Sequence, residues 1–204
     1  MTLFTDVDKT LFTLINTGWS NSAFDIFMPL ISHLADPVTI WLWIPLLGLL
    51  AYRKFPGLNM HCSNTGDPAA AVLPMRYLFS CLNMALIYVV NAGIYQLLKH
   101  LVHRPRPFVI QDAVVRAQLA DMQFFSSFPS GHAANAFMIA VILSAIYTKK
   151  RPVFYFTAFL VALSRIYLGV HYPLDVIAGA LLGLSLTWLI LRLRPINDVF
   201  SAGI

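Results

Sequence analysis

Long apolar runs dominate the hydrophobic pattern of the chain. A transmembrane helix needs about 20 mostly apolar residues. Slightly shorter segments are sufficient when flanking side chains extend to the membrane interface. Five segments fit this description, namely 37–54, 76–99, 131–148, 152–170 and 174–194. The pattern therefore predicts an all-α fold, a polytopic bundle of transmembrane helices.

The beginning of the chain follows a weaker pattern. The stretches 6–17 and 22–35 mix apolar positions with polar ones, and Gly18 separates them. Amphipathic segments of this kind typically lie in the membrane interface. We expect residues 1–36 to form interfacial or partly spanning helices. The prediction is thus five to six spans plus interfacial helices, in a single domain that comprises residues 1–204.

The composition supports this class of protein and argues against others. The chain is 58% hydrophobic and 11% charged, whereas soluble domains are about 45–50% apolar and about 25% charged. The net charge of +5 does not indicate nucleic-acid binding, because no basic run is longer than Lys149–Arg151. Cys62 and Cys81 form neither a disulfide framework nor a metal-binding spacing. The acidic first residues do not resemble a signal peptide.

The basic residues predict the orientation of the bundle. If the five spans alternate, one side receives Arg53, Lys54, Arg76, Lys149, Lys150, Arg151, Arg192 and Arg194, and the other receives Lys9, Lys99, Arg104, Arg106, Arg116 and Arg165. The side with more basic residues is predicted to be cytoplasmic, because basic loops stay inside. The other side then faces the periplasm or the exterior of a bacterial inner membrane, which the chain crosses several times.

Three short motifs fall at span ends on that outer side. They are K-x6-RP (Lys99 to Pro107), PSGH (Pro129 to His132) and SR-x5-H-x3-D (Ser164 to Asp175). Ionisable residues at membrane depth are costly and usually functional. Alternation of the spans brings all of these ends to one face of the membrane, so we expect the motifs to form one site.

The residue types in these motifs predict an anion site. Lys99, Arg106 and Arg165 place three cations around one point. Cations in an apolar setting repel one another unless an anion lies between them, and arginines bind phosphate oxygens in pairs. Ser130 and Gly131 lead into a helix, whose N–H groups add donors, and glycine permits close approach of the backbone. A phosphate or diphosphate is the expected ligand.

Two histidines complete the predicted chemistry. Across one helical turn, the Asp175 carboxylate can hold Nδ1–H of His171 and leave Nε2 free. This is the arrangement of an activated nucleophile. His132 is then available as the acid that protonates the departing oxygen. The expected intermediate is a phosphohistidine, which water activated by His132 hydrolyses, and this chemistry requires no metal.

Together and in this order, the three motifs resemble the signature of the type-2 phosphatidic acid phosphatase superfamily, which includes membrane lipid phosphatases, glucose-6-phosphatase and vanadium haloperoxidases. The resemblance covers residues 99–175, and all eleven signature positions are filled. It implies a metal-independent phosphohydrolase of the bacterial membrane branch, without a cofactor. It also implies that His171 is the nucleophile, Asp175 its orienting group and His132 the general acid. The implied phosphate-binding residues are Lys99, Arg106, Ser130, Gly131 and Arg165.

Several alternatives remain open at the level of function. The small size and short loops resemble bacterial members that act on undecaprenyl diphosphate or phosphatidylglycerol phosphate, and lipid A phosphatases are similar in size and motif. Vanadate-dependent oxidation uses the same kind of pocket, but five spans argue against it. A non-enzymatic anion or lipid transporter or binding protein is the alternative from another class. The expected partners are the bilayer and a lipid phosphate, not nucleic acid.

Other residues receive weaker interpretations. Arg104 creates a second Arg-Pro pair, but the six-residue spacing from Lys99 favours Arg106. The stretch 109–128 is interpreted as a short interfacial helix beside the site, with a plain loop as the alternative. The turn-rich stretch 55–74 is expected to be a loop.

Overall fold

The computed structural model of the chain describes residues 2–54, 69–110, 112–116 and 126–193. Within these ranges the fold is all-α, as predicted, with no strand and one isolated bridge between Pro105 and Ser126. The helices are α1 (Thr2–Thr13), α2 (Ser22–Ser32), α3 (Pro37–Lys54), α4 (Ala69–Val102), α5 (Pro107–Ile110), α6 (Gly131–Ile146), α7 (Arg151–Tyr167) and α8 (Pro173–Leu193). Shorter turns are the π-helix η1 (Leu14–Gly18) and the 3-10 helices η2 (His33–Ala35) and η4 (Thr148–Lys150).

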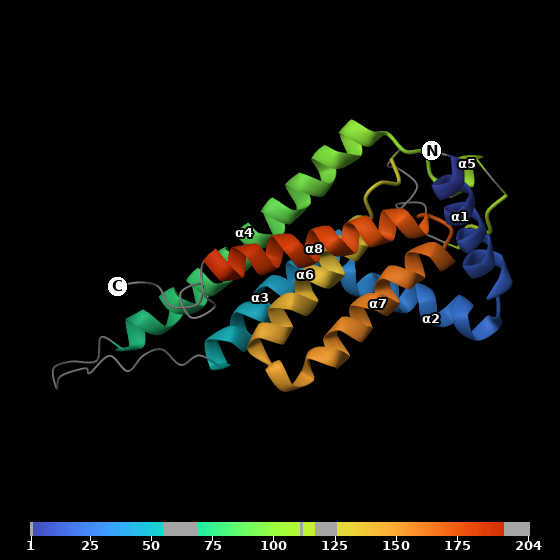
Figure 1. Cartoon of the computed structure of the whole chain (residues 1–204). Coiled ribbons are helices and arrows are strands. Elements are labelled where there is room, and N and C mark those ends of the chain that lie inside the picture. Colours follow the sequence, from blue (N-terminus) through green and yellow to red (C-terminus); the bar gives the residue numbers. More distant parts are fainter. Residues whose placement is uncertain (1, 55–68, 111, 117–125, 194–204) are drawn as a thin grey trace.

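Helix α6 occupies the centre of the bundle. Most of its residues are buried, including the polar Asn135 and Ser144, and a helix that is apolar on every side is typical of such a position. It packs along α7 and α8 and also contacts α3 and α4. Figure 1 shows these helices side by side, while α1, α2 and α5 gather at one end. The starts of α6 and α8 are directed towards the end of the bundle that these shorter elements cover.

Two glycines allow α8 to approach α6 closely. A Cβ at Gly179 would lie 2.2 Å from the carbonyl oxygen of Ser130, and one at Gly183 would lie 2.1 Å from that of Ala134. Small residues four positions apart are typical of close helix contacts in membranes. At the top of this contact the N–H of Ser130 donates to the carbonyl oxygen of Asp175 over 2.9 Å. The second and third motifs are thereby fixed relative to each other.

Fewer helices qualify as membrane spans than the hydrophobic pattern predicted. By length and composition, two described segments qualify, Tyr77–Val102 and Pro173–Leu193. Ser22–Ala35 and Pro37–Lys54 qualify only together, as a broken span bent by 59°. Helix α6 is apolar but has 16 residues, or about 24 Å at 1.5 Å per residue, which is less than the roughly 30 Å hydrocarbon core. The described residues thus provide two to three candidate spans, and the number of five to six stays a prediction.

The N-terminal helices are more closely integrated into the bundle than the sequence pattern indicated. Helix α1 packs on α8, and α2 packs on α7. Phe12 is buried, and so are the polar side chains of Asp8, Asn16 and Ser32. The interpretation of residues 6–17 and 22–35 as interfacial helices did not include these contacts. Several polar positions that suggested exposure to water face the protein interior instead.

The two predicted connections also differ from the structure. Helix α4 begins at Ala69, so the last part of the predicted loop 55–74 is helical, while residues 55–68 lie outside the described ranges. The second connection is the predicted helix 109–128. Its first two residues belong to the end of α5, but residues 112–116 and 126–128 are not helical. Residues 111 and 117–125 lie outside the described ranges.

The side chain of Asn16 explains the conformation of the segment 112–116. Its Oδ1 accepts a hydrogen bond from the N–H of Val114, and its Nδ2 donates to the Val114 carbonyl, both over 2.9 Å. These contacts use the backbone groups that a helix would need for itself. Nδ2 of Asn16 also donates to the carbonyl of Tyr167 over 2.8 Å, so the segment is attached to the end of α7.

Candidate active site

The predicted site residues lie at helix ends on one end of the bundle. Lys99 stands in the last turns of α4, His132 at the start of α6, Arg165 in the last turn of α7, and Asp175 in the first turn of α8. All of the predicted site residues are buried, and none is more than 8% exposed as a whole residue: Lys99, Arg106, Ser130, His132, Arg165, His171 and Asp175. His171 lies within electrostatic range of Lys99, Arg106, Arg165 and His132. The structure therefore brings the three motifs together.

Each of the three cations is held by an oxygen of a neighbouring segment. The donor–acceptor pairs are Lys99 Nζ to the carbonyl of Ser126 (3.0 Å), Arg106 Nη1 to the carbonyl of Val170 (3.3 Å) and Arg165 Nη1 to Oγ of Ser32 (2.6 Å). These acceptors carry no net charge, so the bonds orient the cations without neutralising them. A polyanion such as phosphate is the ligand that suits this arrangement.

His171 is placed to act as a neutral base or nucleophile. Burial, followed by the positive charges of Arg106, Lys99 and Arg165, holds the pKa of His171 well below its usual range. Both effects disfavour the imidazolium, because burial penalises a charge and nearby cations repel it. At neutral pH the ring therefore keeps a nitrogen lone pair, which an attack on phosphorus requires.

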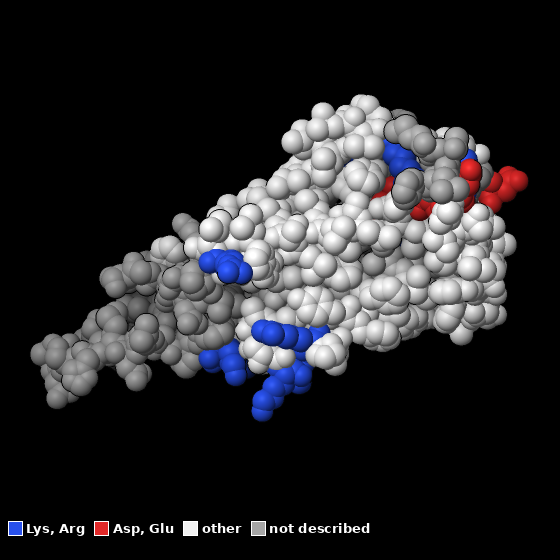
Figure 2. Space-filling view, in the orientation of Figure 1, with Lys and Arg blue, Asp and Glu red and all other residues white. Residues whose placement is uncertain are grey.

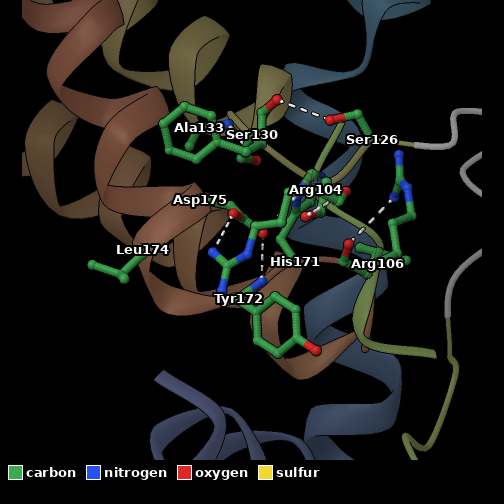
Figure 3. A network of polar contacts seen from close by, with 12 residues as sticks. Arg104, Arg106, Ser126, Ser130, Ala133, His171, Tyr172, Leu174 and Asp175 are labelled. Carbon is green, nitrogen blue, oxygen red and sulfur yellow. Dashed lines mark hydrogen bonds and ion pairs between the residues drawn. The ribbon is translucent and has the colours of Figure 1, made fainter. Parts of the chain in front are cut away.

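The predicted contact between His171 and Asp175 is longer than a hydrogen bond. Nδ1 of His171 lies 3.9 Å from Oδ2 of Asp175, beyond the usual limit for such a bond. Instead, Oδ2 accepts from the N–H of Tyr172 over 2.9 Å, and Oδ1 accepts from Nη1 of Arg104 over 2.6 Å (Figure 3). The sequence argument placed both residues on one helix, but α8 begins at Pro173, after His171.

Arg104 is the main residue that the sequence argument underrated. Its guanidinium bridges two buried carboxylates, with Nη1 2.6 Å from Asp175 and Nη2 2.5 Å from Asp8. It also lies over the ring of Tyr172, 4.3 Å from the centroid. Burial opposes the charge, but the carboxylates of Asp175 and Asp8 raise the pKa of Arg104. Arg104 is thus an ionic support for Asp175, whereas Arg106 stays the arginine of this segment that is predicted to bind an anion.

Asp8 extends this support to helix α8. Its Oδ1 accepts from the backbone N–H of Leu174 over 2.9 Å, which satisfies a donor in the first turn of α8. Asp8 therefore joins α1 to the helix that carries Asp175. A signal for this role was present in the sequence, since an acid within an apolar segment requires a cationic partner when it is buried.

The start of α6 agrees with the prediction only in part. Oγ of Ser130 accepts from the N–H of Ala133 over 3.4 Å and begins the helix. The N–H of Ser130 donates to the Asp175 carbonyl, so it is not directed at an anion as predicted. A Cβ at Gly131 would lie 3.2 Å from the ring of Tyr95. Glycine therefore also leaves room for the ring of Tyr95 on α4, besides any approach to a ligand.

His132 has a partner that the sequence argument did not identify. Nε2 of His132 contacts Oδ1 of Asp36, which stands between η2 and α3. An aspartate before a proline is typical of the start of a helix, and no local spacing connects Asp36 with a motif residue 96 positions away.

Comparison with known proteins identifies the family. Residues 77–198 match the PAP2 superfamily, and this range contains all three motifs. The chain belongs to the PAP2 superfamily. The resemblance inferred from the motifs is thereby confirmed. Among the residues that the structure describes, no group of three or more histidine, cysteine, aspartate or glutamate side chains is arranged to hold a metal ion.

Curated relatives each match part of this chain. The bacitracin transport permease protein BcrC of Bacillus licheniformis is 39% identical over 88 residues, which are 41% of this chain and 43% of that protein. The undecaprenyl-diphosphatase of Sulfolobus acidocaldarius is 31% identical over 119 residues, or 58% and 57% of the two chains. This chain therefore spans about half the length of these curated relatives.

Longer matches come from a mycobacterial protein and from a crystal structure. The decaprenylphosphoryl-5-phosphoribose phosphatase of Mycobacterium tuberculosis is 33% identical over 153 residues, which are 75% of this chain and 71% of that protein. LpxE of Aquifex aeolicus superposes with a TM-score of 0.70 at 26% identity, over 91% of this chain and 95% of LpxE. The fold of this protein is thus that of known PAP2 proteins almost from end to end.

Proposed function

We propose that the protein is a metal-independent lipid phosphatase that works through a phosphohistidine intermediate. The observation that carries this proposal is a buried histidine, His171, with a depressed pKa among the cations Lys99, Arg106 and Arg165. A neutral imidazole is the nucleophile, and the three cations bind the phosphoryl oxygens. Phosphatases of lipid phosphates among the relatives support the same class of reaction.

The proposed reaction has two steps. Nε2 of His171 forms a bond to phosphorus while the bond from phosphorus to the leaving oxygen breaks, and His132 gives its proton to that oxygen. Water then attacks the phosphohistidine and loses a proton to His132 as the phosphorus–nitrogen bond breaks. Free phosphate and the original protonation states result. The cations stabilise the equatorial oxygens as charge develops in both steps.

An apolar cavity next to the site supports a lipid as the substrate. It has a volume of about 250 Å³ and lies between η2, α3, α6 and α7. Ala136, one helical turn after His132, contributes to its lining, and Ile139, Leu143, Trp43, Phe154 and Thr157 extend it along the bundle. A cavity of this kind can receive part of a hydrocarbon chain while the phosphate lies at the cations.

Filling this cavity is expected to weaken binding of the lipid chain. Thr157→Trp places an indole where Thr157 now lines the cavity. Excluding about two methylene groups from an apolar site costs about 1.6 kcal/mol, so we expect KM for a long-chain lipid phosphate to rise roughly tenfold. KM for a short-chain phosphate ester should not change. Steady-state kinetics on both substrates measure the difference.

The matched control is Phe156→Trp on the same helix. Phe156 is 61% exposed and does not line the cavity, so this variant should behave like the wild type. An equal rise in KM for long and short substrates in Thr157→Trp would assign the cavity no part in lipid binding.

The proposed substrates are undecaprenyl diphosphate or phosphatidylglycerol phosphate, with lipid A as the alternative. The test is release of inorganic phosphate by the purified protein in detergent with EDTA present. Each of these lipids and phosphatidic acid is assayed on one preparation. Release from at least one lipid is expected, and the preferred lipid identifies the substrate. No release from any of them would favour an anion or lipid transporter, the alternative from another class.

The proposed active site faces the periplasm or the exterior. Figure 2 shows most visible Lys and Arg side chains at the end of the bundle opposite the visible acidic ones. The basic end includes Lys54, Lys150 and Arg192, at or near the ends of α3, η4 and α8. This distribution supports a cytoplasmic basic end.

Single cysteines test this orientation in intact cells. Asp112→Cys and Lys150→Cys are each introduced in a background with Cys62→Ser and Cys81→Ser, and both positions are exposed. A membrane-impermeant thiol reagent should label position 112 and spare position 150. Labelling of position 150 alone would reverse the proposed orientation. Labelling of both after the cells are opened provides the control for accessibility.

A further inference from the structure

The segment Ser32–Asp36 forms one wall of the site although it carries none of the three motifs. Oγ of Ser32 accepts from Nη1 of Arg165 over 2.6 Å. Four residues later, the carboxylate of Asp36 contacts the imidazole of His132. The bend between α2 and α3 therefore contacts both a phosphate-binding residue and the expected general acid.

Both carboxylate oxygens of Asp36 face imidazole rings. Oδ1 contacts Nε2 of His132, and Oδ2 lies 2.5 Å from Nδ1 of His33. The side chain of Asp36 is 24% exposed and lies between His132 at 11% and His33 at 44%. The three side chains thus form a line from the buried acid to the surface of the protein.

The backbone at this bend has hydrogen bonds of its own. An aspartate that precedes a helix usually accepts from the N–H groups of the first turn. Here the hydroxyl of Thr39 donates to the carbonyl oxygens of His33 and Asp36, over 2.7 Å and 2.9 Å. Thr39 therefore supports the turn, while the carboxylate of Asp36 is directed at the two histidines.

We propose that Asp36 is a positioning residue that orients His132 and keeps it in the imidazolium form needed for proton donation. The proposal rests on the phosphatase reaction proposed above. A carboxylate that accepts from one ring nitrogen fixes the ring and favours its doubly protonated form. Nε2–H of His132 is then donated to Asp36, and Nδ1–H is the proton that passes to the leaving oxygen. His33 orients the carboxylate from its other side.

The charges around His132 show why such a carboxylate is needed. The cations Lys99, Arg106 and Arg165 lie around His171, which is also within electrostatic range of His132. Positive charges this close disfavour a further proton on His132. The groups that face it from the bend are Asp36, with His33 beyond. Asp36 is therefore the negative charge that allows an acid to persist beside a group of cations.

Asp36→Asn tests the proposal, because an amide keeps the shape and removes the charge. A positioned acid contributes about 10²–10⁴ in rate, and we expect kcat on a lipid phosphate to fall by roughly 10- to 100-fold. The alkaline limb of the kcat profile reports loss of the acidic proton. It should move to lower pH by about 1 unit or more, because the imidazolium has lost its carboxylate partner.

The leaving group gives a second measurement. An aryl phosphate releases a phenolate that needs little protonation. Single-turnover release of the phenolate should therefore fall less than threefold in Asp36→Asn, whereas release of a lipid alcohol shows the full loss. A defect in folding or in phosphate binding would affect both substrates equally.

Thr39→Val provides the matched structural control. It removes the hydroxyl that supports the same turn and leaves the carboxylate in place, so the pH profile should remain that of the wild type. If Asp36→Asn does not yield folded protein, Asp36→Glu is measured instead. We expect Asp36→Glu to lower kcat, because the carboxylate is displaced by one methylene group. The alkaline limb should stay at its wild-type pH, because the negative charge is retained.

The outcomes separate this proposal from the proposed function. A wild-type protein that releases no phosphate contradicts the phosphatase, whatever Asp36 does. An active wild type with an unmoved alkaline limb in Asp36→Asn overturns the role of Asp36 and leaves the phosphatase intact. A limb that moves equally in Thr39→Val also overturns it, because the effect is then one of the turn.

Discussion

Replacement of His171 by alanine is expected to abolish phosphate release, with kcat lower by roughly 10⁴-fold or more, as for other enzymes that lose a covalent nucleophile. His171 is the buried imidazole at the centre of the cation group. The other described histidines differ from His171: His132 and His33 contact the carboxylate of Asp36, and His100 and His103 are exposed. Phosphate release from a lipid substrate in detergent measures the loss.

A trapped intermediate gives this prediction a direct readout. Brief incubation with a radiolabelled lipid phosphate, followed by alkaline denaturation, should leave label on the wild-type protein and none on His171→Ala. His100→Ala is the matched control, because that exposed histidine lies beside Lys99 at the same end of α4. More than a tenth of wild-type activity in His171→Ala would rule out His171 as the nucleophile.

The sequence predicted the parts of the site that depend on short spacings. Lys99 and Arg106 are seven positions apart, and the PSGH motif sets the start of α6. Such local patterns depend mainly on helix geometry and on which residues begin a helix. Helix ends that alternate across a bundle then bring the motifs to one end. For this reason the cation group around His171 could be predicted without a structure.

The contacts that support these residues could not be predicted in the same way. Arg104 pairs with Asp8, and His132 contacts Asp36, and each pair is separated by 96 positions. No spacing rule connects residues so far apart. The polar positions of the N-terminal helices were interpreted as facing the interface, because an amphipathic pattern does not distinguish a polar protein interior from water. The close approach of α6 and α8 through Gly179 and Gly183 likewise depends on the packed bundle.

Replacement of Arg104 by glutamine is expected to reduce both stability and activity severely. The side chains of Asp8 and Asp175 are 1% and 0% exposed, so the variant leaves two buried carboxylates without their shared cation. Removing one partner of a buried ion pair typically costs about 3–5 kcal/mol. The start of α8 should loosen as well, because Asp8 also accepts from Leu174. Thermal unfolding in detergent and phosphate release measure the two effects.

A double-mutant cycle with Asp8 distinguishes this ionic support from simple loss of packing. Asp8→Asn removes one of the two carboxylates, so Arg104→Gln should cost less in that background than in the wild type. The coupling expected for residues in contact is about 0.5–3 kcal/mol. Asp6→Asn, an exposed position two residues earlier on α1, should change stability by less than about 0.5 kcal/mol. Additive effects of Arg104→Gln and Asp8→Asn would mean that the guanidinium supports Asp175 without any contribution from its contact with Asp8.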